Sequence, residues 1–203
     1  MGYATQWLTG EFTGYPLQGQ GMLTPEGTYG KCMGLGLLRS RCLSTNWGVP
    51  NTFQALMWEA GEKDPNQQTL MAFAWFLPYG VPLGEITYMN QKTVVEIEKL
   101  LLAFGTRTAS FTPCWRANSH VEIEGMHPRE WVAATWDHAP KPEVLVVVSN
   151  LEVGKPAEIP LRWKGFAGAK VTDARTGETV EVKDGKLTVK VDAERFRLLK
   201  VEG

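Results

Sequence analysis

The last third of the chain alternates apolar and polar residues at the two-residue period of a β-strand. The apolar residues of the segment from Leu187 to Val191 fall on one face, which predicts a strand buried on one side. The preceding Asp184-Gly185 pair has the residue types that a two-residue type I′ hairpin requires. Glu143 to Leu151 is instead a nearly continuous apolar run, which predicts a strand buried on both faces.

Other extended segments complete this region. Trp131 to Trp136 and Phe196 to Val201 are rich in apolar residues, and Asp173 to Gly177 carries turn residues between two such segments. Together these segments give about seven strands and no convincing helix. The pattern therefore predicts an antiparallel β-sandwich at the end of the chain.

The earlier part of the chain contains helical patterns. Apolar residues recur at helical spacing from Val94 to Phe104, Asn90 has the residue type of an N-terminal cap, and Gly105 has that of a C-terminal stop. Asp64-Pro65 predicts the start of a second helix that continues to Phe76. A third amphipathic segment, Lys31 to Cys42, is a glycine-rich helix candidate.

Short extended segments lie before and between these helices. Tyr3 to Thr9 and Gly84 to Tyr88 carry strand-like residues, so strands and helices are mixed along this region. Together the two regions predict an α+β multidomain fold, with an α/β layer first and an antiparallel sandwich second.

Three segments resemble a known junction between domains. Phe111-Thr-Pro-Cys-Trp115 is followed by a polar stretch, by Trp131 to Trp136 and by Val144-Leu-Val-Val-Val-Ser-Asn150. This order is similar to the passage from the last barrel helix into the C-terminal sandwich of TIM-barrel glycosidases, particularly relatives of glycoside hydrolase family 123. Val171 to Glu178 and Asp184 to Val189 resemble the closing hairpins of such sandwiches.

The resemblance implies a division of the chain into two domains. Residues 1–125 would form a partial (β/α) barrel, and residues 126–203 the antiparallel β-sandwich. A complete barrel of this kind needs about 250 residues, so the chain would be a truncated piece of such a protein. An exposed sheet edge and uncovered apolar faces predict that it forms a homo-oligomer.

Composition narrows the partners that the chain can have. The 203 residues carry a net charge of −1 at pH 7, which gives no basic field for nucleic acid. Apolar runs fall short of the roughly 20 residues that span a bilayer. Residues 1–20 show no export signal, so a cytoplasmic location and export after loss of an N-terminal signal both stay open.

No cofactor or metal is predicted. Gly34-Leu-Gly36 resembles the start of a dinucleotide loop, but Arg39 stands where the third glycine belongs. Cys114, His120 and His127 are close enough in sequence to suggest zinc, yet their spacing matches no zinc motif. We interpret these three residues as packing and hydrogen-bonding groups.

Glycoside hydrolysis usually requires two carboxyl groups on either side of the scissile bond. Glu11 follows the apolar segment that ends at Thr9, the position at which barrel enzymes hold catalytic groups. Glu85 follows a turn and is the second candidate. Both residues have a simpler interpretation as loop carboxylates that pair with arginine.

Aromatic and polar residues suggest a surface that binds a carbohydrate or another small molecule. Tryptophan and tyrosine rings stack on the apolar faces of sugars, and arginine, asparagine and histidine bond to hydroxyl or acidic groups. Trp75, Trp131 and Trp136 are better explained as core residues. The candidates for substrate binding are Tyr15, Arg39, Trp47, Trp58, Trp115, Arg116 and His120, with Asn118 beside them.

Three functions remain open from the sequence. The first is hydrolysis of glycosidic bonds by Glu11 and a second carboxyl group. The second is a non-catalytic module that binds carbohydrate or assembles. The third is a promiscuous hydrolase of activated esters that uses Cys114 as nucleophile, with His120 or His138 as base.

Overall fold

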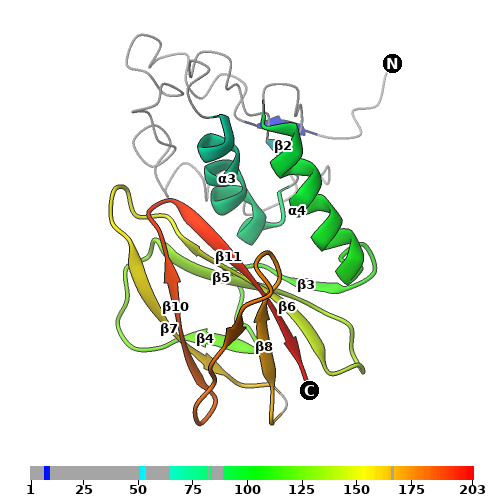
Figure 1. The fold of residues 1–203 in the computed structure, drawn as a ribbon, viewed down its shortest axis with the longest axis vertical. Helices are drawn as coiled ribbons and strands as arrows, with labels where there is room; N and C mark the ends of the chain where they lie inside the picture. The colour runs from blue at the N-terminus through cyan, green and yellow to red at the C-terminus, as the bar shows by residue number, and fades with distance from the viewer. Residues whose placement is uncertain (1–6, 10–50, 54–64, 82, 84–88, 166) are drawn as a thin grey trace.

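The computed structural model describes residues 7–9, 51–53, 65–81, 83, 89–165 and 167–203. In this part of the chain, two helices precede most of the strands (Figure 1). The helical elements are α3 (Pro65–Phe76), the short 3-10 helix η3 (Leu77–Tyr79) and α4 (Gln91–Phe104). Two short strands, β1 (Trp7–Thr9) and β2 (Asn51–Phe53), come before them.

The larger sheet has six strands in the order β3-β5-β6-β11-β8-β9. All its neighbouring strands are antiparallel. Its centre is β6, which pairs with β5 on one side and β11 on the other. The strands are β3 (Ser110–Thr112), β5 (Trp131–Asp137), β6 (Glu143–Asn150), β8 (Lys170–Asp173), β9 (Thr179–Val180) and β11 (Arg195–Glu202).

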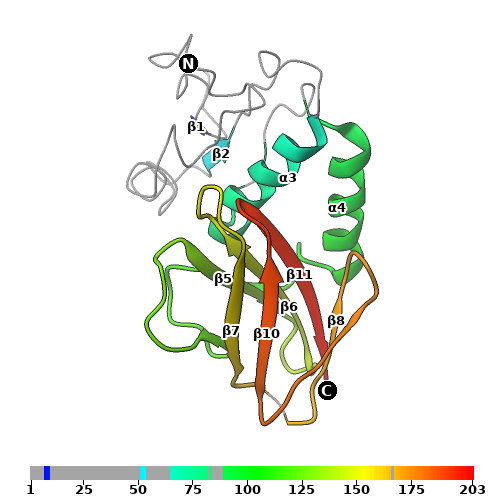
Figure 2. The same ribbon diagram turned by 60° about the vertical axis from the view of Figure 1, so that its left-hand side comes forward.

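The smaller sheet has three antiparallel strands in the order β10-β7-β4. They are β4 (Val121–Ile123), β7 (Ala157–Trp163) and β10 (Lys186–Val191). In β10, buried and exposed residues alternate strictly, as the apolar pattern of this segment predicted. Figure 2 shows this sheet facing the larger one.

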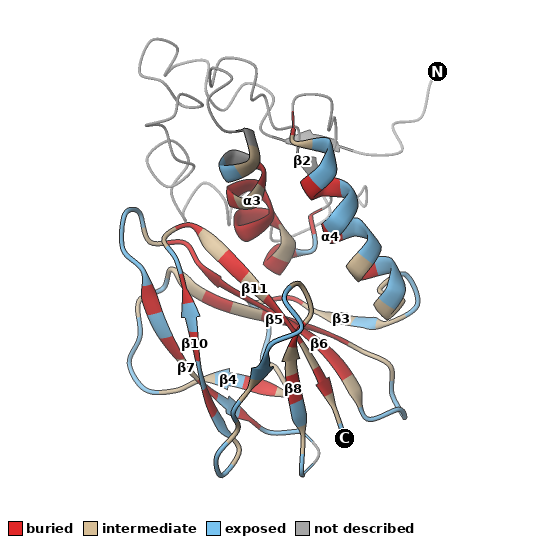
Figure 3. Cartoon of the chain, in the orientation of Figure 1, coloured by how far each residue is buried: buried red, intermediate tan, exposed pale blue. Residues whose placement is uncertain are grey.

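The larger sheet is buried on both faces. On one face, Val144, Val146 and Val148 of β6 pack against the smaller sheet. On the other face, Leu145 and Val147 pack in the same core as helices α3 and α4. In Figure 3 the buried residues of both sheets and of helix α3 are red. This three-layer arrangement explains why β6 is a nearly continuous apolar run, as the sequence predicted.

Helix α4 begins and ends where the sequence predicted. The side chain of Asn90 accepts a hydrogen bond from the Thr93 backbone N–H at 3.0 Å, which satisfies one of the free donors of the first turn. Gly105 follows the helix with φ +85° and donates its N–H to the Leu101 and Leu102 carbonyls. A left-handed backbone there strains any residue that has a Cβ.

Helix α3 is buried around most of its circumference, including Trp75 and Phe76. It continues into η3, and the turn ends at Gly80 with φ +70°. A Cβ atom on this glycine would overlap the Phe111 ring of β3. Gly80 therefore permits the close packing of the helix end against the larger sheet. The predicted start and end of this helix are confirmed for the described residues from Pro65 on.

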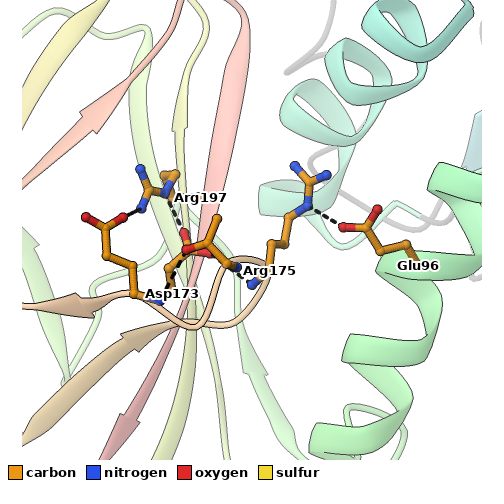
Figure 4. A network of polar contacts seen from close by, with 6 residues as sticks. Glu96, Asp173, Arg175 and Arg197 are labelled. Carbon is orange, nitrogen blue, oxygen red and sulfur yellow. Dashed lines mark hydrogen bonds and ion pairs between the residues drawn. The ribbon is translucent and has the colours of Figure 1, made fainter.

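Two turns of the sandwich follow the residue types that predicted them. Asp184 and Gly185 have φ values of 52° and 73°, the left-handed backbone that a type I′ hairpin requires at both positions. The carboxylate of Asp173 accepts backbone hydrogen bonds from Arg175 at 2.9 Å and Thr176 at 2.8 Å, which holds the β8–β9 turn. The same carboxylate is paired with Arg197 (Figure 4).

The sandwich that the sequence predicted is confirmed, with seven strands after residue 125 in the described part of the chain. Two earlier strands also belong to its sheets, because β3 pairs with β5 and β4 pairs with β7. The predicted boundary at 125/126 lies between β4 and β5 and stays a prediction. Pro140 and Pro142 lie in the connection between β5 and β6, where pairing stops after Asp137.

The predicted barrel is not seen in the residues that the structure describes. Of its expected strands, only the end of Tyr3 to Thr9 is described, as β1, which pairs in parallel with β2. The helix predicted at Lys31 to Cys42 and the strand predicted at Gly84 to Tyr88 lie outside the described residues.

The helices of the described part are all too short or too polar to cross a membrane.

Candidate functional site

The described site candidates lie on the segment that joins β3 to β4. Its start is held by the Cys114 backbone N–H, which donates to the Pro78 carbonyl of η3 at 3.0 Å. Its end is held by Asn118, whose side-chain oxygen accepts the N–H groups of His120 and Val121 at 2.8 and 3.1 Å. The Asn118 amide also donates to the Thr135 hydroxyl of β5 at 3.0 Å. The segment is therefore anchored at both ends.

Trp115 and Arg116 project from this anchored segment. The Trp115 side chain is 41% exposed, which is unusual for a large aromatic residue. The Arg116 guanidinium lies 4.9 Å from the centre of its ring, within the range of a cation–π contact. No described carboxylate forms an ion pair with Arg116. This pair therefore presents an aromatic ring and an unneutralised positive charge side by side.

A hollow of about 460 Å³ opens beside Arg116. It lies where β4 of the smaller sheet approaches β5 of the larger one, and its volume is in the usual range for small-molecule sites. Gly125 on its rim has open space around its Cα. Its polar and aromatic lining comes from Arg116, Asn118, Glu122, His127, Trp131 and Lys164.

Two rings on the wall of the hollow are parallel. His127 and Trp131 have ring centres 6.4 Å apart and an interplanar angle of 4°. The Trp131 indole N–H donates to the Glu152 carboxylate at 2.9 Å, which fixes the orientation of the ring. The His127 Nδ1 lies 2.9 Å from the Pro128 carbonyl oxygen. The wall is therefore preorganised by hydrogen bonds that lie outside the hollow.

Of the two basic side chains at the hollow, Lys164 and Arg116, one has an acidic partner. Lys164 forms an ion pair with Glu122 at 2.6 Å, and this hydrogen bond lowers the pKa of the Glu122 carboxyl below its usual value. Glu122 is therefore ionised at neutral pH and neutralises Lys164. Arg116 is left as the uncompensated charge of the described lining, which favours an anionic or electron-rich ligand.

His120 contacts residues of the two sheets. Its ring stacks on Trp163 with centres 5.8 Å apart and an angle of 20°, and its Nε2 lies 3.7 Å from the Asp137 carboxylate. It does not line the hollow that Arg116 lines. The structure thus brings Trp115 and Arg116 together and turns His120 toward Trp163, in the core between the sheets.

The other predicted site residues cannot be placed. Both catalytic candidates, Glu11 and Glu85, lie outside the described residues. The same is true of the remaining substrate-binding candidates, Tyr15, Arg39, Trp47 and Trp58. Their assignments stay predictions.

The histidines proposed as partners of Cys114 have other contacts. His138 Nε2 donates to the Phe104 carbonyl at 2.7 Å, and its ring packs on Phe104, so it closes the end of α4. Cys114 packs against the core of the helices and the larger sheet. In the described part of the chain, no cluster of three or more histidine, cysteine or acidic residues is arranged to hold a metal.

Sequence reasoning missed part of the hollow. Trp131 was predicted to be a core residue, and it packs against the core between the sheets, but it also lines the hollow. Trp75 and Trp136 are buried in the core as predicted. Lys164 carried no signal of its own, because only the pairing of β4 with β7 brings it beside Glu122.

Comparison with solved structures finds the same kind of fold in parts of two alpha-amylases. An alpha-amylase from Geobacillus thermoleovorans, solved in complex with acarbose, has a TM-score of 0.55 at 10% identity, over 93% of this chain and 47% of that one. The structure resembles part of a glycoside hydrolase. A noncanonic maltogenic alpha-amylase from Thermotoga neapolitana gives 0.50 at 13% identity, over 97% of this chain and 50% of that one.

These likenesses concern the fold. The chain spans half or less of the length of the two amylases. No protein-family model matches the sequence, and no curated protein matches it. The shared architecture is therefore that of a portion of a larger glycoside hydrolase, and chemistry has to be argued from individual residues.

Proposed function

We propose that this chain is the C-terminal part of a glycoside hydrolase-like protein, related to family 123, and that it hydrolyses glycosidic bonds through paired carboxyl groups. The observation that carries the proposal is the likeness to an alpha-amylase over 93% of the chain. The likeness is one of fold, so the activity itself is the proposal. In this proposal Glu11 and Glu85 are the catalytic pair, on the partial barrel that would precede the sandwich.

The two carboxyl groups have different roles. One protonates the oxygen of the leaving group, and the other acts as the nucleophile or activates a water molecule. In glycoside hydrolases generally, a low-dielectric site and the proximity of the second carboxylate keep the acid protonated at neutral pH. Trp115 supplies an exposed ring on which a sugar stacks, and Arg116 supplies donors to its hydroxyl or acidic groups.

The test measures hydrolysis of a panel of 4-nitrophenyl glycosides by the full chain. Glu11→Gln and Glu85→Gln keep the side-chain size and remove the ionisable group, so kcat/KM should fall about 100-fold or more in each. Glu62→Gln is the matched control, because Glu62 stands in a polar stretch of the sequence and is not a catalytic candidate, and it should keep full activity. Full activity in Glu11→Gln would contradict the assignment.

A second candidate function is favoured by the exposed Trp115. A non-catalytic module would bind a sugar through this ring without hydrolysing it. Such a protein would show no turnover of any glycoside, and Trp115→Ala would abolish its sugar binding. In the hydrolase, by contrast, Trp115→Ala raises KM with a smaller effect on kcat.

The ester hydrolase has less support, because His120 and His138 contact other groups. Full esterase activity in Cys114→Ala would rule out Cys114 as the nucleophile and contradict this function.

A further inference from the structure

We propose that the hollow between β4 and β5 is a binding site for an acidic sugar, of the size of one uronic acid unit. This inference goes beyond the proposed function, because binding at the hollow requires neither Glu11 nor hydrolysis. The site is carried by the anchored β3–β4 segment, the parallel rings of His127 and Trp131, and the charge of Arg116.

Size and wall chemistry favour a sugar ring. The hollow measures about 460 Å³, and one pyranose ring with its substituents fits within such a volume. The Trp131 and His127 rings are stacked and parallel to within 4°, and this aromatic stack on the wall of the hollow can pack against the C–H face of a sugar. Because the indole N–H is already bonded to Glu152 at 2.9 Å, the ring does not need to reorient when a ligand binds.

Charge favours an acidic sugar over a neutral one. Lys164 is neutralised by Glu122 at 2.6 Å, whereas no described carboxylate pairs with Arg116. A guanidinium binds a carboxylate through two parallel hydrogen bonds, and it is held here over Trp115. The Lys164 ammonium has three N–H donors, so beside its ion pair with Glu122 it can also donate to hydroxyl groups of the ligand.

The test is a ¹H–¹⁵N NMR titration of the full chain with sodium glucuronate, and with glucose as the neutral counterpart. The indole N–H signal of Trp131, assigned with Trp131→Phe, should shift on addition of glucuronate. Glucose should bind about tenfold more weakly. Equal affinity for the two sugars, or no shift of this signal, would overturn the proposal.

Two exposed positions provide variants that should leave folding intact. Arg116→Gln should raise the Kd for glucuronate about tenfold, and His127→Ala should raise it severalfold. Arg129→Gln is the matched control, since Arg129 is also exposed but does not line the hollow. An unchanged Kd in Arg116→Gln would contradict the site.

Two further titrations separate sugar binding at the hollow from simple anion binding and from catalysis. Inorganic sulfate should compete only weakly, because it has no apolar ring face to stack; competition equal to that of glucuronate would show an anion site and overturn the sugar assignment. Glu11→Gln should bind glucuronate with the wild-type Kd. Loss of hydrolysis with retained binding therefore tests the catalytic pair alone, and loss of binding in Arg116→Gln tests the hollow alone.

Discussion

Arg175 of the β8–β9 turn donates a hydrogen bond to Glu96 of helix α4, with 3.0 Å between Nε and the carboxylate oxygen (Figure 4). The contact connects the helix layer to a turn of the larger sheet, 79 residues apart in sequence. The same guanidinium lies 6.0 Å from the centre of the Phe196 ring. Both contacts depend on the β8–β9 turn, which Asp173 holds.

The Arg175–Glu96 pair should be a weak link, because the two side chains are 26% and 43% exposed. A double-mutant cycle with Arg175→Ala and Glu96→Ala should give a coupling free energy of about 0.5 kcal/mol from urea unfolding. Glu98 is exposed on the same helix, and a cycle with Glu98→Ala should give no coupling. A coupling above about 2 kcal/mol would mean that the pair is shielded from solvent.

Asp173 should matter more, because its side chain is only 2% exposed and Arg197 is its ion-pair partner. Asp173→Ala removes the acceptor of two backbone N–H groups and of the Arg197 guanidinium, so the free energy of unfolding should fall by about 2–3 kcal/mol. The control Glu181→Ala removes an exposed pair with Lys183 and should change it by less than about 0.5 kcal/mol. Equal effects of the two variants would contradict this account of the turn.

Acidification should lower the free energy of unfolding through the ion pairs of Glu124 beside the smaller sheet. The hydrogen bond from Arg162 lowers the pKa of Glu124 below its ordinary value of 4.5, and Lys186 acts in the same direction. The unfolded chain therefore takes up this proton at a higher pH than the folded protein does. The stabilisation is complete above pH 4.5 and is lost as the pH falls through the lowered pKa of the folded state.

Urea unfolding midpoints measured as a function of pH test this relationship. In Arg162→Gln the pKa of Glu124 should move back toward 4.5, so less stability should be lost on acidification than in the wild-type protein. Arg129→Gln, which removes an arginine with no described carboxylate partner, should keep the wild-type pH dependence. An identical acid loss in both variants would contradict the role of Arg162.

Local signals explain which elements could be predicted. Asn90 and Gly105 mark the ends of α4. An N-terminal cap and a C-terminal glycine with a left-handed backbone depend only on residues that are close in sequence. Asp184-Gly185 likewise encodes its own turn. The run from Val144 to Val148 indicated burial on both faces, but the sequence does not say that α3 and α4 cover one of them.

Long-range pairing explains what could not be predicted. Strands β3 and β4 have three residues each, too few for a periodic pattern to stand out. Trp131 was assigned to the core because most aromatic side chains pack in cores. Its place at the hollow depends on how β4 approaches β5, and a residue pattern within one strand does not contain that information.

In the proposed function, two carboxyl groups of this chain hydrolyse a glycosidic bond. Its most direct test is the pH dependence of kcat/KM for hydrolysis of the best 4-nitrophenyl glycoside by the wild-type chain and by Glu11→Gln. We expect a bell-shaped wild-type profile, with one limb for each carboxyl group, and the loss of one limb together with most of the activity in Glu11→Gln. No turnover above that of heat-inactivated protein at any pH, or an unchanged profile in Glu11→Gln, would contradict it.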